Sequence, residues 1–147
     1  MNASPVPTLP CMCASLRRAS RALTQFYEDA LRPTGLRGTQ LSILQVLMLA
    51  GDVTQGQLGQ ILTMDSTTLT RTLAIMIREG WVKKRRGDDR REWRISMSPE
   101  GKALLKRALP IWERTQTKLQ KQLGNPRWEQ LKALADTVTN VATAPET

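Results

Sequence analysis

The hydrophobic residues of this chain change their spacing once, in the segment that follows Gly80. Before it, and again after Pro99, apolar positions recur every three or four residues, which is typical of amphipathic helices. Between residues 81 and 97 apolar residues alternate with polar and charged ones, which is typical of strands. One short interruption of this kind predicts a mainly α protein with a small two-stranded β-wing, an α+β fold.

Four helices are expected before this change. Their predicted ranges are residues 13–31, 40–50, 55–62 and 66–79. Pro33 disfavours helix at the residue before it and so ends the first helix. Thr39 is the predicted cap of the second helix, and Gly51 is its predicted end.

The third and fourth helices lie close together in sequence and carry strong start signals. Thr54 followed by Gln57 fits a capping box, and Asp65 is a favoured cap for the fourth helix. The two glycines of the third helix each weaken it by about 1 kcal/mol relative to alanine, so packing must hold it. Two helices joined by a tight break at Thr63–Met64 predict a helix-turn-helix.

The second half of the chain predicts a hairpin and two more helices. The strands are residues 81–86 and 92–97, joined by a charged turn. Ser98 is the expected cap of a long helix over 99–123, which Pro110 should kink. Asn125 is the expected cap of the last helix. Its apolar stripe is Trp128, Leu131, Leu134, Ala135, Val138 and Val141.

Composition removes several classes of function. The chain has 147 residues, a formal charge of +9, no histidine and two cysteines. Without histidine there is no Ser-His-Asp or Cys-His catalysis and no His-based zinc site, so we expect no enzyme, no cofactor and no metal centre. Cysteines at positions 11 and 13 cannot staple distant segments, which favours a reducing cytoplasm. No apolar run approaches the roughly 18 residues of a membrane span, so no membrane partner is expected.

The exposed start of the fourth helix has the side chains that a DNA-reading helix needs. Its apolar stripe turns inward, and the other positions near its start are short and polar. Hydroxyl groups can donate to phosphates or touch base edges, and an arginine can read guanine through two hydrogen bonds. We therefore expect DNA contacts from Ser66, Thr67, Thr68, Thr70 and Arg71. The alternative is that serine and threonine are simply favoured near a helix start.

The hairpin concentrates positive charge at its turn. Arginine is planar and weakly hydrated, so it inserts well into a narrow minor groove. We expect DNA contacts from Arg85, Arg86, Arg90 and Arg91, with Asp89 orienting a neighbouring guanidinium or closing the turn. The alternative is a solvated charged hairpin without a partner, although a cluster of one sign repels itself.

Several stretches of this sequence resemble the MarR family of bacterial transcriptional regulators. The stretch Ile77–Arg85, followed by Asp89–Gly101, resembles the wing signature of that family. The upstream segment Thr54–Leu73 resembles its helix-turn-helix. The resemblance extends over residues 13–142 and implies a winged helix-turn-helix with flanking dimerisation helices.

The resemblance also assigns roles at the tip of the wing. Carried over by position, Arg91 is the residue that enters the minor groove, with Asp89 and Arg90 supporting it. Met97-Ser98 stands where Leu-Thr is usual, a conservative departure. Gly59 stands where alanine is common, which loosens the third helix.

The resemblance further implies a homodimer on a pseudo-palindromic operator, released by a ligand or an oxidant. The residues agree on the dimer, because the first helix and the last two are longer and more apolar than a winged helix needs. An intramolecular three-helix subdomain is the alternative. The expected organisation is a mobile arm (1–12), an N-terminal dimerisation helix (13–36), a winged helix-turn-helix DNA-binding domain (37–98), C-terminal dimerisation helices (99–143) and a tail (144–147).

The regulatory input stays open at this stage. Cys11 and Cys13 lie at the start of the first helix, where the helix dipole and Arg17 favour the reactive thiolate, so they are candidate oxidant sensors. The pair could instead bind a soft metal or be inert. The other expected input is a small amphipathic or anionic effector. Its candidate neighbours are Arg17, Arg21, Tyr27 and Trp112.

Three functions compete. The favoured one is a dimeric, sequence-specific regulator of transcription, a repressor, with double-stranded DNA as its partner. An enzyme in which Asp88 and Asp89 hold a metal is disfavoured, because the two acids lie on an arginine-rich tip. The third is a basic winged-helix adaptor that binds protein or an anionic surface without operator specificity.

Overall fold

The computed structural model describes residues 6–146, which fall into two compact units that divide after Ile111. Residues 1–5 of the predicted arm and residue 147 of the predicted tail lie outside the described residues. The first unit contains α1 (Met12–Leu31), η1 (Arg32–Thr34), α2 (Gly38–Ala50), β1 (Val53–Thr54), α3 (Gln55–Leu62), α4 (Ser66–Arg78), β2 (Val82–Arg86), β3 (Trp93–Met97) and the start of α5 (Pro99–Leu123). The second contains the rest of α5 and α6 (Asn125–Thr143).

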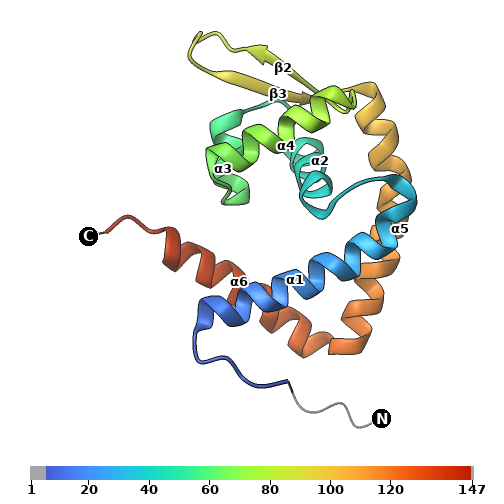
Figure 1. The fold of residues 1–147 in the computed structure, drawn as a ribbon, viewed down its shortest axis with the longest axis vertical. Helices are drawn as coiled ribbons and strands as arrows, with labels where there is room; N and C mark the ends of the chain where they lie inside the picture. The colour runs from blue at the N-terminus through green and yellow to red at the C-terminus, as the bar shows by residue number, and fades with distance from the viewer. Residues whose placement is uncertain (1–5, 147) are drawn as a thin grey trace. The chain divides into compact units, whose positions relative to one another are not determined.

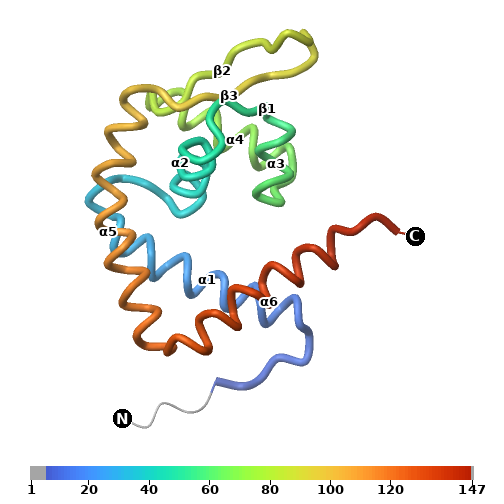
Figure 2. The backbone as a smooth tube through the Cα atoms, turned by 180° about the vertical axis from the view of Figure 1, so that it is seen from behind, coloured from blue at the N-terminus to red at the C-terminus, as the bar shows by residue number. Residues whose placement is uncertain are grey.

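The sheet has three antiparallel strands, and the prediction of two was incomplete. The strand order is β1-β3-β2, with Val53 opposite Ile95 and Val82 opposite Met97 (Figure 2). The extra strand β1 is only two residues long, so it carries no alternation of its own. Its pairing with β3 fixes the hairpin to the segment that precedes the helix-turn-helix.

Helices α2, α3 and α4 pack against one another and against this sheet (Figure 1), and the core that they share is apolar. Alternation along β3 sends Ile95 into this core, where it is fully buried. The helices contribute side chains that are likewise buried: Ile43, Leu44, Leu58, Leu69, Leu73 and Met76. This core fixes α4 and the wing as parts of one body.

The helix-turn-helix forms by the predicted local signals. Thr54 and Gln57 make the expected capping box, with bonds of 2.9 and 3.1 Å. A Cβ on Gly59 would lie 3.3 Å from the carbonyl oxygen of Met64, so the glycine lets the turn approach α3 closely. Thr63 has a left-handed backbone with φ of 52°, and its amide closes the turn on Gln60.

The predicted caps of α2 and α6 were wrong. Helix α2 begins at Gly38, because Gln40 Oε1 accepts the Arg37 amide and Glu28 Oε1 accepts the Gly38 amide, so Thr39 lies inside the helix. The acceptor for the Gly38 amide comes from α1, so the sequence next to Gly38 does not reveal it. Helix α6 is capped by Gly124, whose φ of 82° reverses the chain, and Asn125 is its first residue.

The chain ahead of α1 is tied to that helix. The Arg18 guanidinium donates to the Pro7 carbonyl at 2.9 Å, and the Ser15 hydroxyl donates to the Leu9 carbonyl at 3.3 Å. These bonds hold residues 7–9 of the expected arm along the first two turns of α1.

Not all predicted apolar stripes are covered in the single chain. Met48, Ile61 and Ile77 follow the three- or four-residue spacing of apolar positions that predicts an inward face, but each is exposed, because α2, α3 and α4 are short helices that share one small core. In α6 only Trp128 of the predicted stripe is buried. The exposed remainder includes Leu131, Leu134, Val138 and Val141.

The junction between the wing and α5 is closely packed. Ser98 accepts the Gly101 amide at 3.0 Å, as predicted for the cap of α5, and donates its own amide to the Trp81 carbonyl. A Cβ on Gly101 would lie 2.0 Å from the Trp81 carbonyl oxygen. Only glycine therefore fits at this position. Helix α5 itself is continuous through Pro110.

We expect Gly101→Ala to lower the free energy of unfolding by about 2–3 kcal/mol, because an added methyl group must displace the backbone of Trp81. Urea unfolding followed by circular dichroism measures the change. Gly56→Ala is the control, since its nearest neighbour is 3.9 Å away. It should raise stability by about 0.5–1 kcal/mol through helix propensity. Equal effects of the two substitutions would contradict the packing argument.

Candidate nucleic-acid interface

The start of α4 is held by Asp65. Its Oδ1 accepts the Thr68 amide at 2.8 Å, and its Oδ2 accepts the Thr68 hydroxyl at 2.6 Å. The hydroxyl bond from Thr68 is the largest cause of the lowered pKa of Asp65, followed by the backbone bond. The carboxylate is therefore ionised at neutral pH and remains an acceptor for both groups.

The polar face of α4 is exposed as predicted, but some of its side chains already make hydrogen bonds within the protein. Ser66, Thr67 and Arg71 are exposed. The Thr70 hydroxyl accepts a 3.0 Å hydrogen bond from Nε2 of Gln55, the first residue of α3. The other amide atom of Gln55, its Oε1, is buried without a hydrogen-bond partner. Sequence reasoning missed Gln55, because only the fold brings it beside α4.

The tip of the wing is a closed turn with an exposed cation. The Gly87 amide donates to the Glu92 carbonyl, and the Glu92 amide donates to the Asp89 carbonyl, each at 2.9 Å. The Asp89 carboxylate accepts the Arg91 amide at 3.0 Å and lies 3.4 Å from its Nε. Asp89 therefore performs both duties predicted for it. The Arg91 side chain remains 91% exposed.

The stem of the wing is anchored by a carboxylate that sequence reasoning missed. Asp52 accepts Arg85 Nη2 at 2.7 Å and Arg94 Nε at 2.9 Å, and its carbonyl accepts Arg94 Nη2. Burial acts to raise the pKa of Asp52, but hydrogen bonds from the two guanidinium groups and their charges outweigh it and lower the pKa. Arg85, a predicted DNA contact, is thus bound to Asp52 and helps to position the stem.

Trp93 holds two more cations of the stem. The Arg86 guanidinium lies 4.0 Å from the centre of its ring, and the Lys84 ammonium lies 4.6 Å from it. Cation–π contact of this kind stabilises a charge that would otherwise repel its neighbours. Arg86 also donates to the Arg90 carbonyl, which links the stem to the tip.

A hollow of about 420 Å³ lies where α3, α4 and the wing meet. It brings together Thr70 and Arg91, two of the predicted DNA contacts from distant parts of the sequence. The remaining lining residues come from the start of α3 and from the wing: Thr54, Gln55, Gly56, Lys84, Glu92 and Trp93. Thr70 belongs to the hydroxyl row of α4, which we define as Ser66, Thr67, Thr68 and Thr70. Through Thr70 this row meets the cationic tip of the wing at one hollow.

The predicted effector residues are not gathered into one site. Arg17 Nη2 donates to Cys13 Sγ at 3.2 Å, and both side chains are exposed, as is Cys11. Tyr27 is half-buried in edge contact with Phe26, and burial raises its pKa. It follows Cys13 by fourteen residues, or roughly 20 Å along the helix. The thiols and Tyr27 thus belong to different regions of α1.

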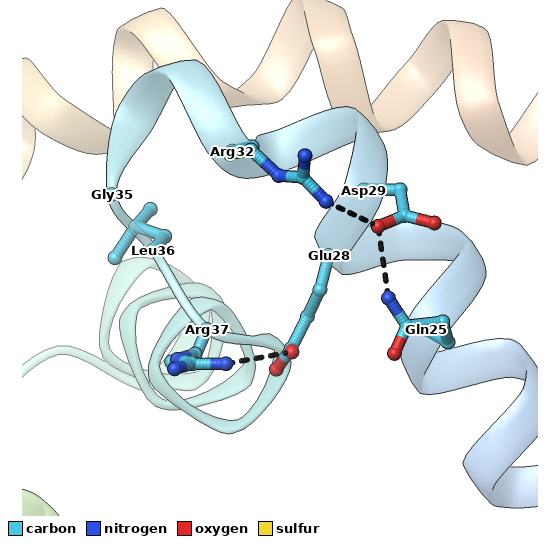
Figure 3. A pocket seen from close by; sticks show the side chains of 7 residues that line it. All are labelled: Gln25, Glu28, Asp29, Arg32, Gly35, Leu36 and Arg37. Atoms are coloured by element: carbon cyan, nitrogen blue, oxygen red, sulfur yellow. Dashed lines mark hydrogen bonds and ion pairs between the residues drawn. The ribbon is translucent and has the colours of Figure 1, made fainter.

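A second hollow, of about 260 Å³, lies at the junction of α1 and α2 (Figure 3). Its charged side chains are paired: Glu28 accepts Arg37 at 3.2 Å, and Asp29 accepts Arg32 at 2.8 Å (Figure 3). Charges neutralised in this way leave little to attract an anionic effector. None of the predicted effector residues lines it.

Residues 6–146 contain no cluster of three or more Cys, Asp or Glu side chains able to hold a metal ion. Within the same range, each helix is too short or too polar to pass through a lipid bilayer.

Comparison with known proteins gives one consistent family. The model of the MarR family matches residues 34–92. The chain is 32% identical over 101 residues to the organic hydroperoxide resistance transcriptional regulator of Bacillus subtilis, covering 68% of this chain and 69% of that protein. It is 31% identical over 85 residues to the HTH-type transcriptional regulator YwoH of the same organism. That match covers 58% of this chain and 62% of the relative's length.

A solved structure matches over nearly its whole length. The M. tuberculosis transcriptional regulator MosR, crystallised in complex with DNA, is 36% identical to this chain, with a TM-score of 0.80. The alignment covers 91% of this chain and 99% of that one. The matched part of this chain is therefore much longer than the helix-turn-helix alone.

We expect Asp52→Asn to lower stability at neutral pH by about 1 kcal/mol, because solvent screens a carboxylate that is one-third exposed. The folded protein has the lower pKa, so this contribution is present above the pKa of the unfolded state. It is lost as pH falls through the folded value. Unfolding in urea at a series of pH values should show the difference between variant and parent shrinking below about pH 4.

Asp88→Asn removes the same charge from the exposed tip and is the matched control. It should leave the unfolding midpoint unchanged throughout. A constant difference for Asp52→Asn across the pH series would contradict the assignment of Asp52 as the anchor of the wing.

Proposed function

Because the chain belongs to the MarR family of transcriptional regulators, we propose that it is a homodimeric, cytoplasmic repressor that binds a pseudo-palindromic operator. Each subunit inserts the start of α4 into the major groove and the tip of the β2–β3 wing into the adjacent minor groove. A change at the thiols of α1 releases the DNA.

One observation carries the DNA-binding proposal. Thr70 of α4 and the exposed Arg91 of the wing border the same hollow, and the stem of the wing is braced by Asp52 and Trp93. A braced stem presents the free tip at a fixed distance from α4, which is what simultaneous contact with two grooves requires. The DNA complex of MosR supports the same use of this fold.

The dimer proposal rests on the uncovered stripe of α6. Leu131, Leu134, Val138 and Val141 are spaced three, four and three residues apart, so they lie on one face of the helix. Their exposed fractions in the single chain range from 41% to 73%. Burying such a stripe against a second copy is favourable, and a two-fold dimer would place half-sites about one DNA turn apart.

For regulation we favour thiol oxidation over a bound effector. Cys13 is exposed and its Sγ accepts a 3.2 Å hydrogen bond from Arg17 Nη2, and the thiolate form of a cysteine is the one that attacks peroxide oxygen. Attack breaks the O–O bond, leaves Cys13 as a sulfenic acid and releases an alcohol, and Cys11 can then form a disulfide with loss of water. The name of the Bacillus relative, an organic hydroperoxide resistance regulator, supports an organic hydroperoxide as oxidant. The hollow beside Glu28 offers an anionic ligand no unpaired cation among its lining residues.

We expect Arg91→Ala to weaken operator binding by about 1–3 kcal/mol, since it removes a cation of the tip whose side chain is 91% exposed. The operator is first obtained by selection from random duplexes, and affinity is then measured by fluorescence anisotropy at several salt concentrations. The selected motif should be palindromic, and binding should fall steeply with salt.

Arg32→Ala removes another exposed cation, one that is paired with Asp29 away from the wing, and is the control. It should bind like the parent protein. Failure to select any motif would point to the adaptor function, and unchanged affinity of Arg91→Ala would remove the wing from DNA binding.

We expect Cys13→Ser to keep operator affinity but to lose release by cumene hydroperoxide, because serine forms no sulfenic acid. The parent protein should release the operator under the same treatment, and dithiothreitol should restore binding. Cys11→Ser should still respond to the oxidant, stopping at the sulfenic acid. Release of the Cys13→Ser variant by peroxide would contradict the thiol mechanism.

A further inference from the structure

Two hydroxyl groups on the DNA-reading face of α4 are committed to opposite hydrogen-bond directions by their neighbours. A threonine hydroxyl has one proton to donate and two lone pairs to accept with. What it can offer to DNA depends on which of these the protein already uses. Thr68 and Thr70 differ in this respect.

The hydroxyl proton of Thr68 is already used in a hydrogen bond within the protein. Its hydroxyl donates to Asp65 Oδ2 at 2.6 Å, a short distance typical of a bond to a charged acceptor. Asp65 also accepts the Thr68 amide through Oδ1, so one carboxylate binds both the backbone and the hydroxyl group of Thr68. The exposed oxygen of Thr68 can therefore only accept a hydrogen bond from outside.

The hydroxyl of Thr70 acts as an acceptor within the protein. Its oxygen accepts from Gln55 Nε2 at 3.0 Å, which uses one lone pair and leaves the hydroxyl proton available. Thr70 also borders the hollow lined by Lys84, Arg91 and Glu92. The two cations of this hollow attract the acceptor atoms of DNA, to which the Thr70 hydroxyl can donate.

We propose that Asp65 and Gln55 set the hydrogen-bond polarity of the reading face, so that Thr68 accepts from a base amino group and Thr70 donates to an acceptor on DNA. This inference rests on the proposed DNA-binding function. In the major groove, amino donors are N6 of adenine and N4 of cytosine. A phosphate has only acceptor oxygens, so the hydroxyl of Thr68 cannot bind the backbone and is left to read a base.

The Thr70 hydroxyl can donate to one of two kinds of acceptor on DNA, a phosphate oxygen or a base atom such as purine N7. Replacing single phosphates of the selected operator by methylphosphonates tests the first. Replacing single purines by their 7-deaza analogues tests the second. The modification that removes the partner of Thr70 should weaken the parent protein about 3- to 10-fold and leave Thr70→Val unaffected, as for one hydrogen bond.

Asp65→Asn is the decisive variant for Thr68. Asparagine keeps an oxygen that caps the Thr68 amide and is as good a cap as aspartate. Its amide group replaces the acceptor Oδ2 with a donor, which turns the Thr68 proton outward. The parent protein should prefer an adenine or cytosine at one operator position. Asp65→Asn should shift the affinity ratio between operators that differ at that position by about 3- to 10-fold.

Gln55→Glu is the matched variant for Thr70. A carboxylate cannot donate, so it takes the Thr70 proton and removes the donor. The added negative charge weakens binding to all duplexes, and Gln55→Glu in a Thr70→Val background measures that charge effect alone. Gln55→Glu should cost a further 3- to 10-fold, roughly one hydrogen bond, only when Thr70 is present.

The outcomes separate this inference from the proposed function. If the parent protein selects a palindrome but Asp65→Asn retains its base preference while folding normally by circular dichroism, the polarity inference is overturned and the DNA-binding function stands. The same holds if the effect of Asp65→Asn persists in a Thr68→Val background. If the parent protein selects no motif, both are overturned.

Discussion

The reading surface depends on how the wing tolerates its own charge. Cations repel one another on a hairpin this small, and the repulsion must be offset within the chain if the hairpin is to have a fixed shape. Asp52 binds Arg85 and Arg94, and Trp93 lies under Arg86. These contacts brace the stem and leave the tip, where Arg91 is exposed, as the part that lacks a strong partner. The pairing of the stem charges thus gives the wing its fixed shape, and it leaves an exposed cation at the tip that can attract a polyanion.

The same division between positioning and contact occurs on α4. Leu69, Leu73 and Met76 are buried against α2 and α3 and fix the helix in the body. Asp65 and Gln55 are outside the core, yet they decide what the polar face can offer, because each is bonded to a hydroxyl on that face. Residues that would not be chosen as DNA contacts therefore determine the chemistry of those that would.

Much of the helix-turn-helix and of the wing could be predicted from the sequence, because the signals that define them are local. The capping box at Thr54, the cap at Asp65 and the hairpin period all act within a few residues and were predicted correctly. The features that were missed are long-range: β1, the Asp52 anchor and the Gln55–Thr70 bond join segments that are 15 to 42 residues apart. A two-residue strand and a single carboxylate leave no periodic pattern, so only the fold reveals them.

Helix α1 is joined to the DNA-reading part of the chain, helices α2 to α4 and the wing, by a contact between separate elements. Glu28 of α1 accepts the Gly38 amide at 2.9 Å and the Arg37 guanidinium at 3.2 Å, so it holds the start of α2 (Figure 3). Helix α2 in turn packs against β3 and α4. A displacement of α1 would therefore carry α2, and with it the hydroxyl row and the wing, as one body. Cys13 lies at the opposite end of α1, so under the regulation proposed above its oxidation would need to move only this helix to change the spacing of the two DNA-reading units in the proposed dimer.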